Sequence, residues 1–332
     1  MTENGKRDGE ASIVDSVAAY WRTAILRSAF ELHIPDHVMA GLTTPAAIAA
    51  QEGAAVRSLT VLMDSLCALG LLDKSDGVYR LRPHLAALLP SFSQMAPYCM
   101  NAENWTMWGR VTEAVRTGAP VGAGDEYWVD YAHGTRAVTR LQGAEVATIA
   151  AMESGRGVRV VDVGCGSGGI GYGFALADPS ARVTGLDAAG VIERAAEHAS
   201  ELGLSQRVTL RATNVVTAET LGDEQFDLAI VANIAHLLDP ATNRALLRKV
   251  FAALAPAGRV MIIDILPDDE RRTTAYPLMF AVEMLLRTPG GSTYTFAEFS
   301  DWLRQAGFEE IECRPMRGHE SAVMGLKPAS AA

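Results

Sequence analysis

The segment Val160–Gly169, VVDVGCGSGG, joins a short apolar run to a cluster of glycines. The valines are typical of a strand that is buried on both faces of a parallel sheet. Gly164, Gly166 and Gly168 follow at every second position, and glycines in such a turn let the backbone approach a ligand closely. We therefore predict that this strand begins an α/β domain and that a ligand binds where the strand ends.

Asp162, inside this segment, separates two classes of cofactor. Dinucleotide-binding proteins place a glycine-rich turn at the same position, but a carboxylate just ahead of the turn would repel their pyrophosphate. The same carboxylate suits the ammonium group of a bound amino acid, directly or through water. Asp187 ends the next predicted strand, where a carboxylate can bind ribose hydroxyls in either class. Asp162 therefore favours S-adenosylmethionine; the alternative is a tight turn that binds no ligand.

Downstream of residue 158, strands alternate with helices, the pattern of a mostly parallel sheet with helices on both faces. The predicted strands cover residues 158–163, 182–186, 207–212, 228–232, 259–265, 309–314 and 321–326. Helices at residues 276–287 and 296–306 precede the last two strands. We therefore expect an α/β domain with a seven-stranded sheet.

The N-terminal part has a different, mostly helical pattern. Apolar residues recur at helical spacing over residues 13–32 and 57–69. Thr44 followed by proline is a start signal for a short helix at 45–52. Asp76-Gly77 between two short apolar runs predicts a hairpin. Three helices followed by a hairpin predict a mostly α winged-helix domain.

A winged helix raises a DNA-binding regulator as an alternative function, because its third helix often enters the major groove. The charge opposes this: 29 Lys and Arg stand against 39 Asp and Glu, a formal net charge of −10. The candidate recognition helix, 57–69, offers Arg57 beside Asp64 where phosphate binding needs a basic surface. The first helix instead carries more apolar surface, including Tyr20 and Trp21, than a three-helix domain can easily cover alone. We predict that the domain forms a homodimer and binds no nucleic acid.

Length and composition bound the organisation of the chain. Its 332 residues, 49% of them hydrophobic, exceed what a single core usually holds. We expect a winged-helix dimerisation domain at 1–95, a helical linker contributing to the substrate pocket at 96–153, and the cofactor-binding domain at 154–332. The longest apolar run, Leu228–Leu238, is too short to span a membrane, and four scattered cysteines form no metal-ligand pair. These features predict a cytoplasmic protein with no metal site and no membrane contact.

Asp162 with its glycines, Asp187 and the closing strands resemble the class I S-adenosylmethionine-dependent methyltransferases across residues 158–326. The resemblance implies a Rossmann-like sheet with the cofactor at the glycine turn. It places Asn214 where relatives carry an Asp that contacts adenine, and an Asn carbonyl oxygen can still accept the exocyclic amine. The implied cofactor-binding residues are Asp162, Gly164, Gly166, Gly168, Asp187, Ala188, Asn214, Val215 and Asn233.

Two further residues narrow the resemblance. His236 follows the fourth predicted strand and Asp264 ends the fifth, at the edge where open α/β sheets bind ligands. With the winged helix and the glycine motif, they resemble the small-molecule O-methyltransferases of the plant caffeate type and their bacterial antibiotic-pathway relatives. The resemblance implies that His236 removes the proton of the acceptor hydroxyl and that Asp264 orients the imidazole. It also implies that the N-terminal domain exchanges helices with a partner subunit.

Besides Asn214, the chain departs from this family pattern around the expected base. Asp264 matches the family's Glu-containing stretch only with a shift of about one residue. Leu237-Leu238 replaces the Asp-Trp pair that usually follows the histidine, and the second acid expected near the GG pair falls on Thr293. A C-methyltransferase, or an enzyme that uses S-adenosylmethionine without methylating, therefore stays open as an alternative.

The methyl acceptor is expected to be a small, largely apolar or aromatic secondary metabolite, because apolar and aromatic side chains dominate the segments that would form its pocket. Glu283 stands out among them, since a carboxylate within an apolar helix needs a partner or a purpose. The candidate substrate-binding residues are Trp105, Trp108, Trp128, Met279, Phe280, Glu283 and Met284.

Overall fold

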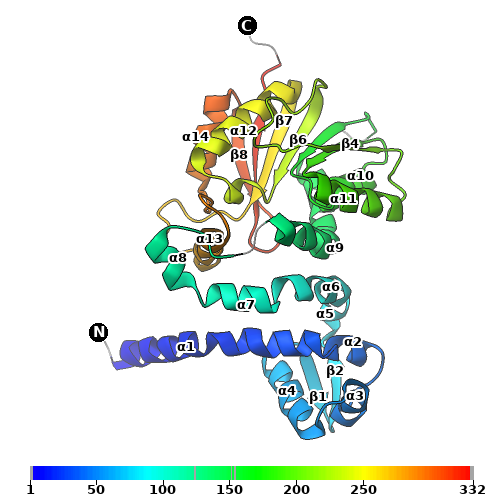
Figure 1. Ribbon diagram of the computed structural model, residues 1–332, viewed down its shortest axis with the longest axis vertical. Helices are drawn as coiled ribbons and strands as arrows, with labels where there is room; N and C mark the ends of the chain where they lie inside the picture. Colours follow the sequence, from blue (N-terminus) through cyan, green and yellow to red (C-terminus); the bar gives the residue numbers. More distant parts are fainter. Residues whose placement is uncertain (1–2, 123–124, 151, 153–154, 330–332) are drawn as a thin grey trace. The chain divides into compact units, whose positions relative to one another are not determined.

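The computed structural model describes residues 3–122, 125–150, 152 and 155–329. They belong to two compact units, residues 1–102 and 103–332 (Figure 1). The predicted boundary at residue 95 falls within a helix of the first unit, and residue 153 lies outside the described residues. The division into segments 1–95, 96–153 and 154–332 stays a prediction.

The first unit contains six helices and one hairpin within its described residues. They are α1 (Glu3–Glu31), α2 (Ile34–Met39), α3 (Pro45–Glu52), α4 (Val56–Ala68), β1 (Leu72–Ser75), β2 (Val78–Leu81), α5 (Pro83–Ala86) and α6 (Leu89–Cys99). The Thr44 hydroxyl accepts a hydrogen bond from Ala47 N at 3.3 Å and so caps α3. Between the antiparallel strands, Asp76 and Gly77 both have positive φ, of 52° and 75°. The predicted helices and hairpin are confirmed.

Helix α2 was not predicted. The apolar pattern predicted a helix over residues 13–32, and α1 ends at Glu31, but a second helix starts at Ile34. His33 turns the chain with φ 46°, and proline is tolerated in the first turn of a helix because that turn needs no N–H donor. Ile34 is 0% exposed and packs in the same core as Leu59 and Met63. Burial therefore stabilises a helix too short to show a clear period.

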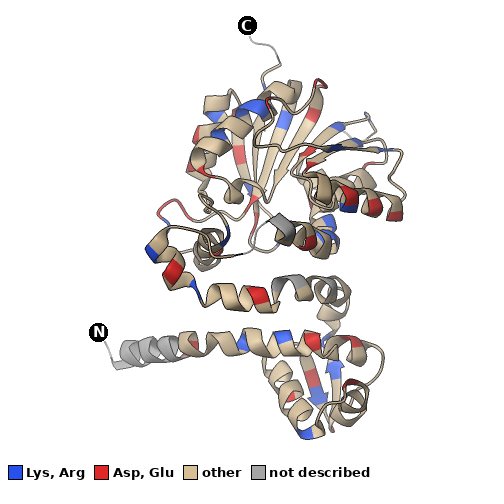
Figure 2. Ribbon diagram, in the orientation of Figure 1, with Lys and Arg blue, Asp and Glu red and all other residues tan. Residues whose placement is uncertain are grey.

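The surface of the first unit combines mixed charge with exposed apolar groups. Basic and acidic residues are interspersed along its helices and hairpin (Figure 2). On α1, Val17 is 71% exposed and Tyr20 and Trp21 are each 58% exposed. A contiguous apolar face of this kind usually marks a contact with another molecule.

The second unit is an α/β domain. Its helices α7 (Ala102–Trp108, whose first residue belongs to the first unit), α8 (Val111–Thr117) and α9 (Asp125–Ala150) precede the sheet. The remaining elements are β3 (Arg159–Val163), α10 (Gly169–Ala177), β4 (Arg182–Asp187), α11 (Ala189–Glu201), β5 (Val208–Ala212), β6 (Phe226–Ala232), the 3-10 helix η1 (Ala235–Leu237), α12 (Pro240–Ala253), β7 (Leu254–Asp264), α13 (Ala275–Arg287), α14 (Phe296–Ala306), β8 (Glu309–Pro315) and β9 (Ser321–Leu326).

The sheet has the order β5-β4-β3-β6-β7-β9-β8. The first five strands in this order, β5, β4, β3, β6 and β7, run parallel. Strand β9 pairs antiparallel with both β7 and β8. The seven predicted strands are confirmed; six have ends within two residues of the prediction, and the seventh is longer. Strand β7 starts at Leu254 rather than residue 259, because Leu254 pairs with Phe226 before a register shift. The APAG stretch that follows, with Ala257 at φ 61°, concealed this first part of the strand from pattern analysis.

Two apolar layers cover the two faces of the sheet. Helices α12 and α14 pack on one face, and α9, α10 and α11 lie on the other (Figure 1). Each fully buried Val, Ile or Leu of these layers contributes about 1.5–3 kcal/mol to folding. Because β3, β4, β6 and β7 are parallel, their carboxyl ends meet at one edge of the sheet, where ligands bind in open α/β folds.

Candidate active site

The glycine loop after β3 has the backbone conformation that only glycine adopts without strain. Gly164, Gly166 and Gly168 have φ of 70°, 56° and 79°. A Cβ at Gly168 would lie 2.1 Å from the Tyr172 ring, and one at Gly164 would lie 2.4 Å from Ile234 Cδ1. Two of the three glycines are therefore required by packing as well as by the turn.

Asp162 lies beneath this loop and is 2% exposed. Its Oδ2 accepts a hydrogen bond from Gly171 N, in the first turn of α10, at 3.0 Å. Burial raises the pKa of Asp162 to about 7, although the hydrogen bond from Gly171 opposes the shift. Near neutral pH, a positive charge that approaches this carboxyl group would therefore favour its ionised form.

The structure brings Asp187, at the end of β4, to the glycine loop. Its Oδ2 accepts from Gly166 N at 2.8 Å, and its Oδ1 accepts from Ala188 N at 2.7 Å. Burial raises the pKa of Asp187, while the two backbone hydrogen bonds lower it in part. Each oxygen keeps a lone pair that can accept from a ribose hydroxyl.

Asn214 and Val215 follow β5. The Asn214 side chain is exposed, and its Oδ1 accepts from Val216 N at 3.0 Å and Thr217 N at 3.2 Å. This oxygen therefore holds a turn together, and a contact with adenine through the same atom would have to displace one of these bonds. Val215 is 8% exposed and belongs to the apolar layer beside α12.

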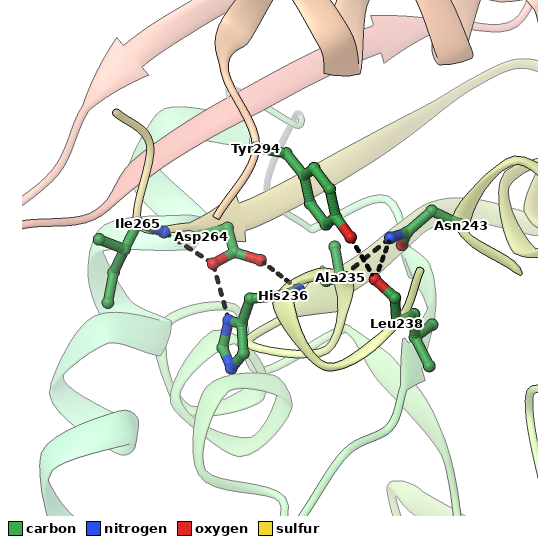
Figure 3. Close-up of polar contacts among 7 residues, drawn as sticks. All are labelled: Ala235, His236, Leu238, Asn243, Asp264, Ile265 and Tyr294. Atoms are coloured by element: carbon green, nitrogen blue, oxygen red, sulfur yellow. Dashed lines mark hydrogen bonds and ion pairs between the residues drawn. The ribbon is translucent and has the colours of Figure 1, made fainter. Parts of the chain in front are cut away.

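His236 and Asp264 form a buried pair at the carboxyl ends of β6 and β7 (Figure 3). Their side chains are 7% and 2% exposed, and His236 Nδ1 lies 2.8 Å from Asp264 Oδ1. Asp264 Oδ2 also accepts from His236 N at 3.1 Å, and Oδ1 accepts from Ile265 N at 2.7 Å. Because a carboxylate only accepts, the proton is assigned to Nδ1, which leaves Nε2 as a proton acceptor.

Three residues that the sequence analysis did not single out hold η1, the turn that carries His236. Asn243 Nδ2 donates to Ala235 O at 2.9 Å and Leu238 O at 3.1 Å, and the Tyr294 hydroxyl donates to Leu238 O at 2.5 Å (Figure 3). Ser292 N donates to the carbonyl oxygen of His236 at 3.0 Å. The close approach of this segment also requires Gly291, since a Cβ there would lie 2.3 Å from His236 O.

Asn233 occupies the bend between β6 and η1. It has φ 56°, a conformation that Asn tolerates better than most residues, and its N–H donates to Ile263 O at 2.9 Å. The bend redirects the chain so that His236 can reach Asp264.

The predicted acceptor residues of α13 have separate surroundings. Phe280 packs edge-on against the His236 ring, with centroids 4.9 Å apart. Met279 is 57% exposed, whereas Met284 is 2% exposed and lies in the core. Glu283 pairs with Arg287 Nε at 2.5 Å, which supplies the partner that a carboxylate in an apolar helix needs. Phe280 is thus the member of this set that the structure brings to the histidine.

The ring contact described for His236 is with Phe280 and involves none of the three predicted tryptophans. Trp105 and Trp108, on α7, are 42% and 43% exposed. Trp128 packs edge-on against Tyr127 and Tyr131 on α9, with centroid distances of 5.1 Å and 6.1 Å. Their contact with an acceptor stays a prediction.

Neither a metal cluster nor a membrane helix occurs in the part of the chain that the structure describes. No three His, Cys, Asp or Glu side chains among these residues gather closely enough to hold a metal ion. None of the described helices combines the length and the apolar character that crossing a bilayer requires.

Comparison with known proteins gives consistent matches along the chain. The O-methyltransferase domain matches residues 121–309, more than half of the chain, and the O-methyltransferase dimerisation domain matches residues 14–91. The chain is 27% identical over 342 residues to the tetracenomycin polyketide synthesis 8-O-methyltransferase of Streptomyces glaucescens, covering 99% of this chain and 100% of that one. It is 29% identical to the 3-hydroxy-5-methyl-1-naphthoate 3-O-methyltransferase of Streptomyces sahachiroi, covering 95% and 94%.

A solved structure shares the fold. Human N-acetylserotonin methyltransferase, in complex with S-adenosylmethionine, aligns with a TM-score of 0.82 at 20% identity, covering 96% of this chain and 98% of that one. The predicted seven-stranded sheet with a mostly helical N-terminal domain is thereby confirmed as the architecture of such enzymes.

The groups at the glycine loop fit the cofactor of this family. Among the described contacts, Asp162 and Asp187 accept hydrogen bonds from backbone N–H groups and from no side-chain cation, so their charge is left for an ammonium group and hydroxyls. Ser167 Oγ is also buried in this loop without a hydrogen-bond partner among those residues. The family match and this fit lead to one conclusion: the chain belongs to the S-adenosylmethionine-dependent O-methyltransferases.

Proposed function

We propose that this enzyme methylates a phenolic or enolic hydroxyl of a small aromatic natural product, with His236 as the general base. The observation that carries the proposal is the buried His236–Asp264 pair, which leaves Nε2 unprotonated beside the Phe280 ring. The two bacterial relatives support the acceptor class, since one methylates a hydroxynaphthoate and the other acts in polyketide synthesis.

The chain's own groups account for the proton transfer. His236 takes the hydroxyl proton at Nε2, and Asp264 holds the Nδ1 proton and stabilises the imidazolium that forms. S-adenosylmethionine, when bound, supplies an electrophilic methyl group. General base catalysis of this kind contributes about 10²- to 10⁴-fold to the rate. The apolar ring of Phe280 packs against this buried imidazole and would favour an aromatic acceptor.

At the glycine loop, Asp162 would face the ammonium group and Asp187 the ribose hydroxyls. The loop glycines would let the backbone lie against the cofactor. Ala188, Asn214, Val215 and Asn233 complete the proposed cofactor-binding residues.

We also propose that the first unit forms a homodimer and does not bind DNA. The match to a dimerisation domain and the exposed Val17, Tyr20 and Trp21 of α1 support this assembly. On α4, the helix that would enter DNA, Asp64 pairs with Lys74 at 2.6 Å, so this surface is not uniformly basic. Light scattering at micromolar concentration should give twice the monomer mass, and a monomer would contradict the proposal.

The acceptor class is tested with S-adenosylmethionine labelled in its methyl group and a panel of phenols, enols and 2-oxo acids. We expect the label in an aryl or enol ether. Label in a new C–CH₃ group would instead favour the C-methyltransferase, and no transfer to any hydroxyl compound would contradict the proposed acceptor class.

A further inference from the structure

Glu320 approaches the His236–Asp264 pair from a different part of the chain. It directly precedes β9, whose first residue, Ser321, is paired with Asp264 at the end of β7. The register therefore places Glu320 just beyond the strand end that carries Asp264. Its carbonyl oxygen accepts from Met316 N at 3.0 Å, which closes the turn between β8 and β9.

The Glu320 carboxylate lies beside two neutral amides. Gln142 Nε2, on α9, donates to Oε2, and the side chain of Asn233 lies near enough to lower the pKa of the carboxyl group. Asn233 stands three residues before His236, in the bend that leads to η1. The Glu320 carboxylate therefore lies close to the bend at Asn233 that leads to His236.

A second contact links the same turn to the covering ring of His236. His319 stacks on Tyr276 with centroids 3.9 Å apart, and Tyr276 stacks on Phe280 at 6.5 Å. Phe280 in turn packs against His236. Residues 319 and 320 therefore contact the site on two sides, through the rings and through Asn233.

The charges around Glu320 make its ionisation sensitive to the site. The ionisable groups that face it are Asp264 on β7, His236 on η1 and Glu145 on α9. Burial and the negative charge of Asp264 raise the pKa of Glu320 to about 7, while Asn233 and His236 oppose this shift. A half-buried carboxyl without an ion-pair partner among the described residues is costly to retain for packing alone.

The position also bears on the family pattern. The resemblance puts a second acid at Thr293, but this residue is 0% exposed and its hydroxyl oxygen has no hydrogen-bond partner among the described residues. A threonine cannot supply the charge of a carboxylate at that place. Glu320 brings a carboxylate to the His236–Asp264 pair from the β8–β9 turn instead.

We propose that Glu320 is a positioning residue for methyl transfer: its negative charge stabilises the imidazolium that His236 forms when it takes the acceptor's proton. In this reaction the hydroxyl proton moves to His236 Nε2, and the oxygen electron pair forms the new C–O bond to the methyl carbon of S-adenosylmethionine. The S–CH₃ bond breaks at the same time, its electron pair stays on sulfur, and S-adenosylhomocysteine leaves; the proton on His236 then leaves to solvent. Glu320 acts through the imidazole and forms no bond to the acceptor. The proposal rests on His236 being the base.

Glu320→Gln tests the charge because it keeps the shape of the side chain, and its amide oxygen can still accept from Gln142 Nε2. The imidazole pKa of His236, followed by NMR and assigned by the resonance missing in His236→Gln, should fall by about one unit. The acid limb of kcat/KM against pH should move to lower pH by the same amount, and kcat should fall about tenfold, with KM for S-adenosylmethionine within twofold. An unchanged His236 pKa would overturn the proposal.

Two variants separate charge from packing. Glu320→Asp keeps the charge and should restore the His236 pKa and most of kcat; if it is impaired as strongly as Glu320→Gln, packing explains the effect and the proposal is wrong. Glu312→Gln removes an exposed carboxylate of β8 that pairs with Arg314, and it should change neither readout. If His236→Gln keeps full turnover, the assignment of the base fails, whereas the NMR shift still reports whether Glu320 acts on the imidazole.

Discussion

Asp162, near the end of β3, and Asp264, at the end of β7, are both 2% exposed, yet different groups hold them. Asp162 accepts from a backbone N–H of α10, and Asp187 beside it accepts from two more. Asp264 accepts from two backbone N–H groups and from the His236 ring. Among the described contacts, Asp162 and Asp187 have no side-chain cation as a partner. Asp264, in contrast, is paired with the imidazole of His236.

This difference matches two kinds of chemistry at one edge of the sheet. Uncompensated carboxylates attract a cationic ligand and lose their raised pKa when it binds. A carboxylate already paired with imidazole fixes the tautomer and stabilises the ring after it takes a proton. Binding and proton transfer are therefore separated between the β3–β4 side and the β6–β7 side of the edge. A substitution on the β3–β4 side should therefore leave proton transfer unchanged, and one on the β6–β7 side should leave cofactor binding unchanged.

The largest effect is expected from Asp264→Asn. An amide at this position can donate to Nδ1, which moves the imidazole proton to Nε2 and removes the acceptor that the reaction needs. We expect kcat to fall about 10³-fold, with the calorimetric affinity for S-adenosylhomocysteine within threefold of the parent enzyme. A loss of affinity greater than the loss of kcat would show that the two sides are not separate.

Gly168→Ala changes the glycine loop on the β3–β4 side and should lower the stability of the protein. The added Cβ would lie 2.1 Å from the Tyr172 ring at φ 79°, so backbone strain and overpacking act together. We expect the free energy of unfolding in urea to fall by about 3 kcal/mol. Gly203→Ala is the matched control: its φ is 67° but nothing lies within 4 Å of the new Cβ, so only the strain of about 1–2 kcal/mol should appear. Equal losses in both variants would exclude the packing contribution.

A smaller effect is expected from pH, through Asp162. Its pKa of about 7 means that the ionised fraction rises about tenfold between pH 6 and pH 8. If the ionised form faces the cofactor's ammonium group, affinity for S-adenosylhomocysteine should rise by up to about tenfold over this range. The sign for folding is opposite: the proton held in the folded state stabilises it below the usual Asp pKa of 3.8, and this contribution is lost as pH rises through about 7.

Asp162→Asn supplies the control for this titration. The variant should bind more weakly at pH 8 and lose most of the pH dependence, with Asp187 accounting for what is left. A pH profile identical to that of the parent enzyme would mean that Asp162 does not face the cofactor.

The sequence predicted best what lies close together along the chain. The glycine loop with Asp162 occupies ten successive residues, and its glycines are required by local turns and by near neighbours. His236 and Asp264 were also predicted as a pair, because His236 follows one strand, Asp264 ends the next, and parallel strands share their carboxyl edge.

What the sequence did not reveal depends on contacts between distant residues. Tyr294 fixes Leu238 and Glu320 approaches Asn233 across 56 and 87 positions, and no local period marks such side chains. The aromatic and methionine pattern of α13 could not distinguish Phe280, which covers His236, from Met284 in the core and exposed Met279. Helical spacing predicts a face of a helix, but the neighbours of that face decide which side chains meet the site.

The central claim is that His236 is the base of an O-methyl transfer, and His236→Gln tests it most directly. The variant keeps a polar side chain of similar length, and S-adenosylhomocysteine affinity measured by calorimetry shows whether the cofactor side is intact. The account predicts unchanged affinity and a fall in methyl transfer to a phenolic acceptor of about 10²- to 10⁴-fold. Turnover within threefold of the parent enzyme, with the cofactor bound normally, would contradict it.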